Sequence, residues 1–169
     1  MASRRADDND EDRFGGDGRG HPVRRGLAVG QRAGTACDRG TGRGTWGPAP
    51  PLLPPGAQIA VLAGNPGAAA PYTVRLKFPA HYAIPAHSHP TDENVVITSG
   101  AVTFGMGDKL EKASPGNKTL KAGGYFLAIA NMNHFAFTGA EGATIVLYGQ
   151  GPVEFKYVNP ADDPRHATK

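Results

Sequence analysis

Hydrophobic and polar side chains alternate in short runs from residue 57 onward, and Gly, Pro, Asn and Asp separate these runs. The alternation is clearest at residues 72–78, where every second side chain is apolar and the intervening ones are polar or charged. A period of two places the apolar side chains on one face of an extended strand. The pattern predicts short strands at residues 58–63, 72–78, 82–87, 93–99, 101–106, 118–121, 125–129, 134–138, 144–148 and 153–158.

About ten short strands in succession leave no room for crossover helices between them. The pattern therefore predicts an all-β domain, an antiparallel sandwich or barrel rather than an α/β fold. Only residues 108–113 have a pattern compatible with a helical turn. No segment repeats itself along the chain, which argues against a propeller or a solenoid. The many glycines (24) and prolines (15) agree with a fold rich in turns.

The first 45 residues differ in composition from the rest, with nine arginines, no lysine, seven acidic residues and one aromatic side chain, Phe14. They show almost no apolar periodicity, so they cannot bury enough surface to offset the entropy cost of ordering. We expect a disordered Arg/Gly-rich tail at residues 1–45 and a Pro-rich, extended entry segment at residues 46–56. A single domain at residues 57–160 and a flexible C-terminus at residues 161–169 would follow.

Three interpretations of the tail stay open. It is a solvated segment without further role, which its composition favours. Its Arg-Gly dipeptides allow weak RNA binding, although the interleaved acidic residues cancel much of the positive charge. A GC-rich gene translated upstream of its true start, or out of frame with it, would also give this composition.

Charge and cysteine content exclude several classes of protein. The 18 basic and 15 acidic residues give a net charge of +3, which is too small to indicate a nucleic-acid partner. The single Cys37 cannot form an internal disulfide, which excludes a disulfide-stapled scaffold. No apolar run has the length of a membrane span and no signal peptide is legible, so we expect no membrane partner. The default location is cytoplasmic, or periplasmic or secreted if the natural start differs.

Three histidines and one glutamate carry the candidate chemistry. His87 and His89 are two residues apart in an extended stretch, so their side chains leave the same face of a strand. Glu93 follows a Pro-Thr-Asp turn that can carry it onto the neighbouring strand, and His134 begins a later strand. An isolated His-x-His pair is more often an exposed turn. Together, however, three imidazoles and one carboxylate favour a divalent first-row metal ion, and octahedral geometry would leave two positions open.

The spacing of these residues extends beyond the His-x-His pair. His87, His89 and Glu93 are followed, after six further residues, by Gly100. Gly123 and His134 stand eleven residues apart. These two spacings resemble the two sequence motifs of the cupin superfamily, and the resemblance spans about residues 56–160.

Four positions depart from the cupin motifs. His81 stands in place of the glycine that opens the first motif. Ile129 and Asn131 replace the proline and glycine that precede the metal-binding histidine, and Thr138 replaces the closing asparagine. These positions shape turns rather than supply ligands, so the resemblance still implies a metal site.

The resemblance implies a double-stranded β-helix, that is, a jelly roll of the RmlC-like cupin type with the metal at the barrel mouth. Carried over to this chain, the ligands would be His87, His89, Glu93 and His134, holding one divalent ion of Fe, Mn, Ni or Zn. Residues 46–165 are similar, in more detail, to small single-domain bacterial cupins of uncharacterised activity. Cupins often pair through sheet edges or outer sheet faces, so we expect a homodimer.

Three functions from different classes stay open. The first is a metal-dependent enzyme acting on a small organic substrate, and the open metal positions favour a dioxygenase-like activity. The second is a metal- or ligand-binding sensor without turnover. An enzyme needs an acid or base near the metal besides the ligands, and the sequence offers no clear candidate, so the catalytic residues stay unknown. The third is a scaffold, which four intact ligands argue against.

Overall fold

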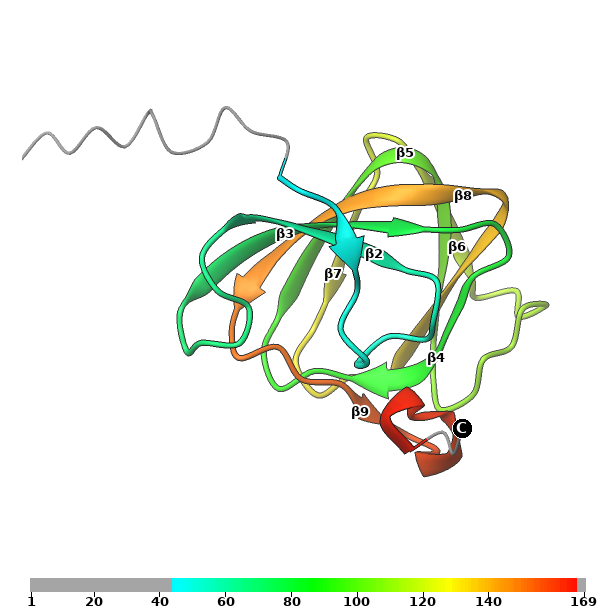
Figure 1. Cartoon of the computed structure of the whole chain (residues 1–169). Coiled ribbons are helices and arrows are strands. Elements are labelled where there is room, and N and C mark those ends of the chain that lie inside the picture. The colour runs from blue at the N-terminus through cyan, green and yellow to red at the C-terminus, as the bar shows by residue number, and fades with distance from the viewer. Residues whose placement is uncertain (1–43, 167–169) are drawn as a thin grey trace, which may run out of the picture. The chain divides into compact units, whose positions relative to one another are not determined.

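The structure, a computed structural model, describes residues 44–166 and is built almost entirely of antiparallel strands (Figure 1). The strands are β1 (Gly47–Pro48), β2 (Gln58–Ala63), β3 (Pro71–Phe78), β4 (Ala83–Ser88), β5 (Glu93–Met106), β6 (Lys118–Lys121), β7 (Tyr125–Ala128), β8 (His134–Gln150) and β9 (Lys156–Tyr157). Two short 3-10 helices, η2 (Pro160–Asp162) and η3 (Pro164–His166), follow β9. The predicted all-β, jelly-roll class is confirmed. The predicted tail, residues 1–45, lies almost wholly outside the described residues and stays a prediction.

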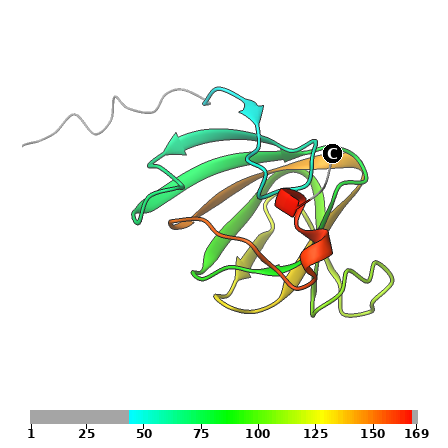
Figure 2. The same cartoon turned by 60° about the horizontal axis from the view of Figure 1, so that its bottom comes forward.

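The long strands β5 and β8 hold the fold together because each pairs with several others. β8 pairs with β3 along its second half and with β4 along its first half. β5 pairs with β8 over nearly its whole length and also with β6 and β7. The strands β1-β2-β3-β8-β4-β9 are bonded neighbours in that order, and β5 lies along β8 and pairs with β6 and β7 (Figures 1 and 2). The sheet thus rolls up around a single core.

The prediction of separate strands at 93–99 and 101–106, and again at 134–138 and 144–148, is wrong, because each pair is one long bent strand. The bends occur where glycines take positive φ, 69° at Gly100 and 65° at Gly142. Glycine adopts this conformation without steric cost, so the chain turns a corner without leaving the sheet. The pairing of β5 with β8 shifts register on either side of Gly100.

The predicted strand at 153–158 is wrong, and the helical turn that the pattern allowed at 108–113 is not formed. That strand is reduced to the two residues of β9. The preceding segment instead runs across the core, where it places Phe155 among the buried side chains. Residues 160–166 form the two 3-10 helices, and Arg165 ties them to this segment by donating from Nη2 to the carbonyl of Phe155 (2.9 Å).

Three of the positions that depart from the cupin motifs, His81, Asn131 and Thr138, lie in turns or bond to them. His81 and Asn131 have φ angles of 56° and 61°, so both adopt the left-handed conformation for which glycine is usually needed. Thr138 Oγ1 accepts a hydrogen bond from the backbone N–H of Tyr82 and donates one to the carbonyl of Pro79. His81 and Asn131 thus occupy left-handed turn positions at a conformational cost of about 1–2 kcal/mol each.

The Pro-rich entry segment packs against the barrel. Leu53 is buried in the hydrophobic core. On either side of Leu53, the carbonyl of Leu52 accepts a hydrogen bond from the Tyr157 hydroxyl (2.7 Å) and that of Pro54 accepts one from the Tyr82 hydroxyl. These contacts make the segment a fixed part of the wall around the interior.

Candidate metal centre

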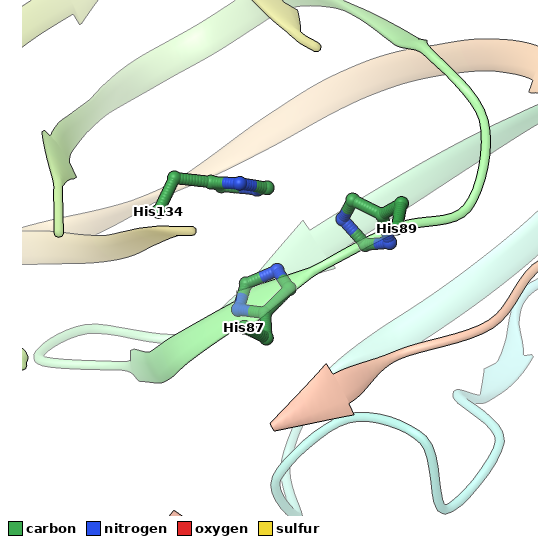
Figure 3. A group of neighbouring side chains, drawn as sticks. All are labelled: His87, His89 and His134. Atoms are coloured by element: carbon green, nitrogen blue, oxygen red, sulfur yellow. The ribbon is translucent and has the colours of Figure 1, made fainter. Parts of the chain in front are cut away.

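His87 lies at the end of β4 and His89 directly follows that strand, and their side chains point into the barrel (Figure 3). Each is only 2% exposed. Because side chains two apart on a strand share a face, the two imidazoles lie side by side, with ring centroids 4.9 Å apart. The predicted common orientation is confirmed.

His134, the first residue of β8, completes a buried group of three. It pairs directly with His87 across the antiparallel β4–β8 ladder, and the two ring centroids are 4.5 Å apart. The centroid of His89 is 5.2 Å from that of His134. One ring nitrogen from each histidine lies within 4.8 Å of the other two, so this triad can hold a metal ion.

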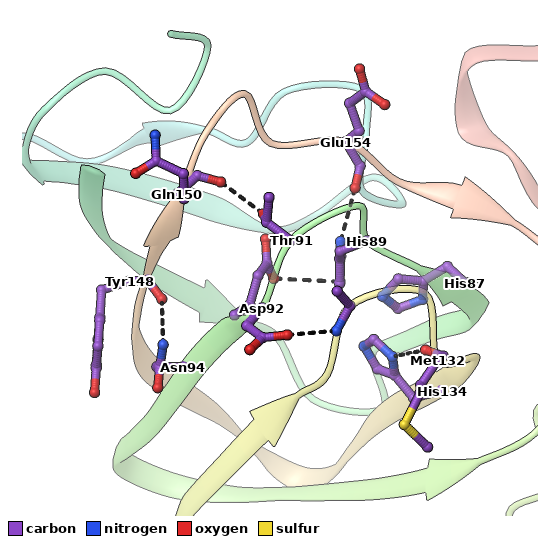
Figure 4. Close-up of polar contacts among 12 residues, drawn as sticks. His87, His89, Thr91, Asp92, Asn94, Met132, His134, Tyr148, Gln150 and Glu154 are labelled. Atoms are coloured by element: carbon purple, nitrogen blue, oxygen red, sulfur yellow. Dashed lines mark hydrogen bonds and ion pairs between the residues drawn. The ribbon is translucent and has the colours of Figure 1, made fainter. Parts of the chain in front are cut away.

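The backbone orients all three imidazoles in the same way. Each Nδ1 lies within hydrogen-bond distance of a carbonyl oxygen, those of Pro85 for His87 (2.6 Å), Glu154 for His89 (2.9 Å) and Met132 for His134 (3.0 Å). Figure 4 shows the second and third of these contacts. A carbonyl only accepts, so Nδ1 carries the proton and Nε2 keeps its lone pair. Metal-ligating histidines are oriented by contacts of this kind.

Glu93 lies beside the triad at the start of β5 and is 4% exposed. Its Oε2 is 3.4 Å from Nε2 of His89, and its Oε1 accepts a hydrogen bond from the Tyr72 hydroxyl (2.9 Å). The turn between His89 and Glu93 is held by Thr91, which donates to the carbonyl of Gln150 at the end of β8 (Figure 4), and by Asp92, which accepts from the backbone N–H of Ala130. As predicted, this turn carries the glutamate onto the next strand.

Burial controls the protonation of the site. It lowers the pKa of His87 well below 6.5 and that of His89 to about 4, and it lowers the pKa of His134 as well. The neighbouring imidazoles lower the pKa values of His87 and His134 further. Burial also raises the pKa of Glu93 to about 7, against the opposing effect of the Tyr72 hydrogen bond. The histidines are therefore neutral at pH 7, the form in which imidazole binds metals.

These shifts predict that the metal-free protein loses stability as the pH falls from 7 to 5. Between its folded pKa and 6.5 each histidine binds more protons in the unfolded chain, so acidification favours unfolding. Glu93 acts in the opposite sense, since its folded pKa of about 7 exceeds its ordinary 4.5. The free energy of unfolding should fall overall, because three histidines act in one direction and one carboxyl in the other. Each uncompensated proton changes it by up to about 1.4 kcal/mol per pH unit.

Urea unfolding of chelator-treated protein at pH 7, 6 and 5 measures this slope. The His134→Ala variant should show a shallower decline, because one of the proton-binding groups is gone. A free energy of unfolding that is flat or rises on acidification would contradict the assignment of buried neutral imidazoles.

Phe155 packs the histidines from the side of β9. Its ring stacks on His87 (centroids 4.6 Å apart, 22° between planes) and meets His89 edge-on (4.6 Å, 90°). The adjacent Glu154 supplies the carbonyl that orients His89. Segments from three distant parts of the chain thus fix the imidazole positions.

Two adjoining cavities share the side chain of Glu93. The smaller, about 40 Å³, is lined by the three histidines, Glu93 and core residues. The larger, about 280 Å³, is lined by Glu93, Tyr72 and apolar side chains but by none of the histidines. Because Glu93 lies in both walls, the larger cavity adjoins the histidines through this side chain.

Sequence reasoning missed Tyr72, whose place in an alternating strand indicated only a core residue. Its hydroxyl lies on Glu93, 21 positions away in the chain. Burial, and then the nearby Glu93, raises the pKa of Tyr72, so its hydroxyl keeps its proton. The other described histidines, His81 and His166, are exposed and lie in a turn and in η3.

No protein-family model matches the chain, and no curated protein sequence is similar to it. Among solved structures, the polyketide cyclase RemF from Streptomyces resistomycificus is similar to it in fold, with a TM-score of 0.53 and 14% identity over 64% of this chain and 75% of that one. An RmlC-like cupin from Shewanella frigidimarina has a TM-score of 0.49 and 15% identity, over 64% of this chain and 84% of that one. The DMSP lyase DddQ from Ruegeria pomeroyi has a TM-score of 0.49 and 19% identity, over 64% of this chain and 56% of that one. In residues 44–166 no helix has the length and apolar character needed to cross a membrane.

Proposed function

We propose that this domain, a cupin by fold, is a metal-dependent enzyme that acts on a small organic substrate. His87, His89, His134 and Glu93 would bind one divalent transition-metal ion, of Fe, Mn, Ni or Zn. The observation that carries the proposal is the common orientation of the three imidazoles, each with Nδ1 on a carbonyl and Nε2 left for the metal. Oε2 of Glu93 lies 3.4 Å from Nε2 of His89, so a carboxylate oxygen stands beside the triad, and a carboxylate suits such an ion.

When bound, the ion would supply Lewis-acid or redox chemistry at the positions that its protein ligands leave open. The chain itself contributes the rest of the site. Apolar side chains line most of the larger cavity, and Tyr72 holds a proton at its hydroxyl oxygen where this cavity reaches Glu93. The protonated Tyr72 hydroxyl is therefore a candidate hydrogen-bond donor to a substrate oxygen, a group that an enzyme needs besides its metal ligands.

A second candidate is a metal- or ligand-binding sensor without turnover. The observation that favours it is that the Tyr72 hydroxyl already donates to Glu93, while the other titratable side chains lining the two cavities are the four proposed ligands. A sensor would bind metal and ligand as the enzyme does, but it would not consume the ligand.

A turnover test separates the two candidates. Untagged protein loaded with Fe, Mn, Ni or Zn is screened for oxygen uptake and for product formation with small phenols and diketones. For the enzyme, the rate per bound metal ion should fall about 100-fold in Tyr72→Phe, measured at saturating metal because the lost hydroxyl also supports Glu93. Tyr148→Phe, at an exposed tyrosine, is the matched control and should keep the full rate. Bound metal with no turnover in any state would favour the sensor.

We also propose that the protein is a homodimer. The outer face of the sheet carries exposed side chains of Tyr125 and Leu127 on β7 and Tyr148 on β8. Asn94 of β5 pairs with both Leu127 and Tyr148, so these residues are neighbours across adjacent strands. An apolar face of this kind is a suitable surface for a second copy.

A further inference from the structure

The larger cavity is lined by apolar side chains except at one place, where two polar side chains lie together. Its volume is about 280 Å³, and the polar side chains on its wall are Tyr72 and Glu93, which are bonded to each other. In the described part of the chain, the residues lining it include no lysine, arginine or aspartate. Apolar side chains cover the remainder, among them Leu53, Ile59, Val74, Leu147, Val153 and Phe155.

The size of the cavity limits its occupant. An apolar cavity of about 150 Å³ is large enough for benzene. About 280 Å³ is close to twice that volume, which fits a bicyclic aromatic molecule or an alicyclic molecule of similar size. Such a cavity is formed before binding, because Tyr82 and Tyr157 pin the entry segment that carries Leu53.

The chemistry of the wall excludes several classes of ligand. A phosphate or carboxylate would find no cationic side chain on the wall, and it would face the carboxyl of Glu93. A sugar of the same size would leave most of its hydroxyls without partners, at about 1–3 kcal/mol for each unsatisfied group. A neutral molecule with one hydroxyl or carbonyl meets a single polar end of the cavity and otherwise apolar contacts.

We propose that this cavity binds a neutral, largely apolar molecule of bicyclic size, with one hydroxyl or carbonyl directed at the Tyr72–Glu93 pair. The inference rests on the proposed function, since it places the reactive end of the substrate beside the candidate metal ligands. Binding in the cavity needs neither the metal nor turnover, so it can be measured by itself.

The test uses calorimetric titration of the full chain with 2-naphthol, before and after removal of metal by a chelator. Two comparison ligands are 2-naphthoate, which adds a charge to the same rings, and glucose, which has many hydroxyls. The neutral naphthol should bind at least about tenfold more tightly than either. Equal or tighter binding of 2-naphthoate or glucose would overturn the inference.

Variants that fill the cavity locate the binding site. Val153→Phe and Ile59→Phe place a larger side chain on its wall, away from the histidines, and each should weaken naphthol binding by about tenfold or more. Val61→Phe makes a matched change at an exposed position of β2 and should leave binding unchanged. Circular dichroism and metal content identify any variant that fails to fold. Naphthol binding that both folded cavity variants retain would overturn the inference.

The outcomes also separate this inference from the proposed function. If the untreated protein retains no metal after metal loading but binds naphthol, the proposed metal site is wrong and the cavity assignment stays intact. Normal metal content without naphthol binding would overturn the cavity assignment alone.

Discussion

The His134→Ala variant is expected to fold and to lose most of its metal. His134 supplies the imidazole that faces both His87 and His89, so its removal leaves only two of the three imidazoles. The remaining donors would hold the ion about 100-fold more weakly, because even the loss of an outer contact to a ligand costs 10- to 100-fold in affinity. Elemental analysis of untagged protein, after dialysis against a weak chelator, measures the metal retained per chain. His87→Ala should behave in the same way.

The matched control for this prediction is His81→Ala. His81 is exposed and lies in a turn, where its backbone N–H bonds to the carbonyl of Gly139. Its imidazole is outside the buried triad, so the metal content should equal that of the wild type. Equal metal in wild type and His134→Ala, or a loss confined to His81→Ala, would show that the ligand assignment is wrong.

The Gly100→Ala variant is expected to lose several kcal/mol of folding free energy. Gly100 has a φ of 69°, and an added Cβ would lie 2.2 Å from the carbonyl oxygen of Gly142 and 2.9 Å from Cα of Ala143. The left-handed conformation costs an alanine about 1–2 kcal/mol, and the overlap with rigid backbone adds about 1–3 kcal/mol. A total of about 2–5 kcal/mol is a large fraction of the 5–15 kcal/mol typical of a domain.

Gly139→Ala is the control for this substitution. Gly139 also lies in a long strand, β8, but its φ is not positive and a Cβ there would meet nothing within 4 Å. Its free energy of unfolding should equal or slightly exceed that of the wild type, since alanine loses less entropy than glycine on folding. Urea unfolding of the three proteins compares them. A Gly100→Ala variant as stable as Gly139→Ala would mean that the bend in β5 tolerates a side chain.

The candidate ligands were legible in the sequence because their arrangement is largely local. His87 and His89 share a strand face whatever the rest of the chain does, since alternation needs only two residues. Glu93 is one short turn away. His134 lies farther off, and it was found from its eleven-residue distance to Gly123 and from the cupin resemblance, not from alternation.

The long bent strands were not legible, because a glycine that ends a strand and one that bends it look alike in the sequence. Gly100 and Gly142 stay within the sheet because β5 and β8 pair on both sides of each bend. Continued pairing depends on the register between segments that are about forty residues apart, and a local pattern holds no information about that register.

The alternating pattern and the motif spacings determined the all-β class and the four candidate ligands of this protein. Only the tertiary structure decided what surrounds those candidate ligands. It brought the Tyr72 hydroxyl to Glu93, gave each imidazole its carbonyl partner and formed an apolar cavity that adjoins them. The physical reason is that periodicity determines the face on which a side chain lies, whereas its contacts depend on which distant segments pack against that face.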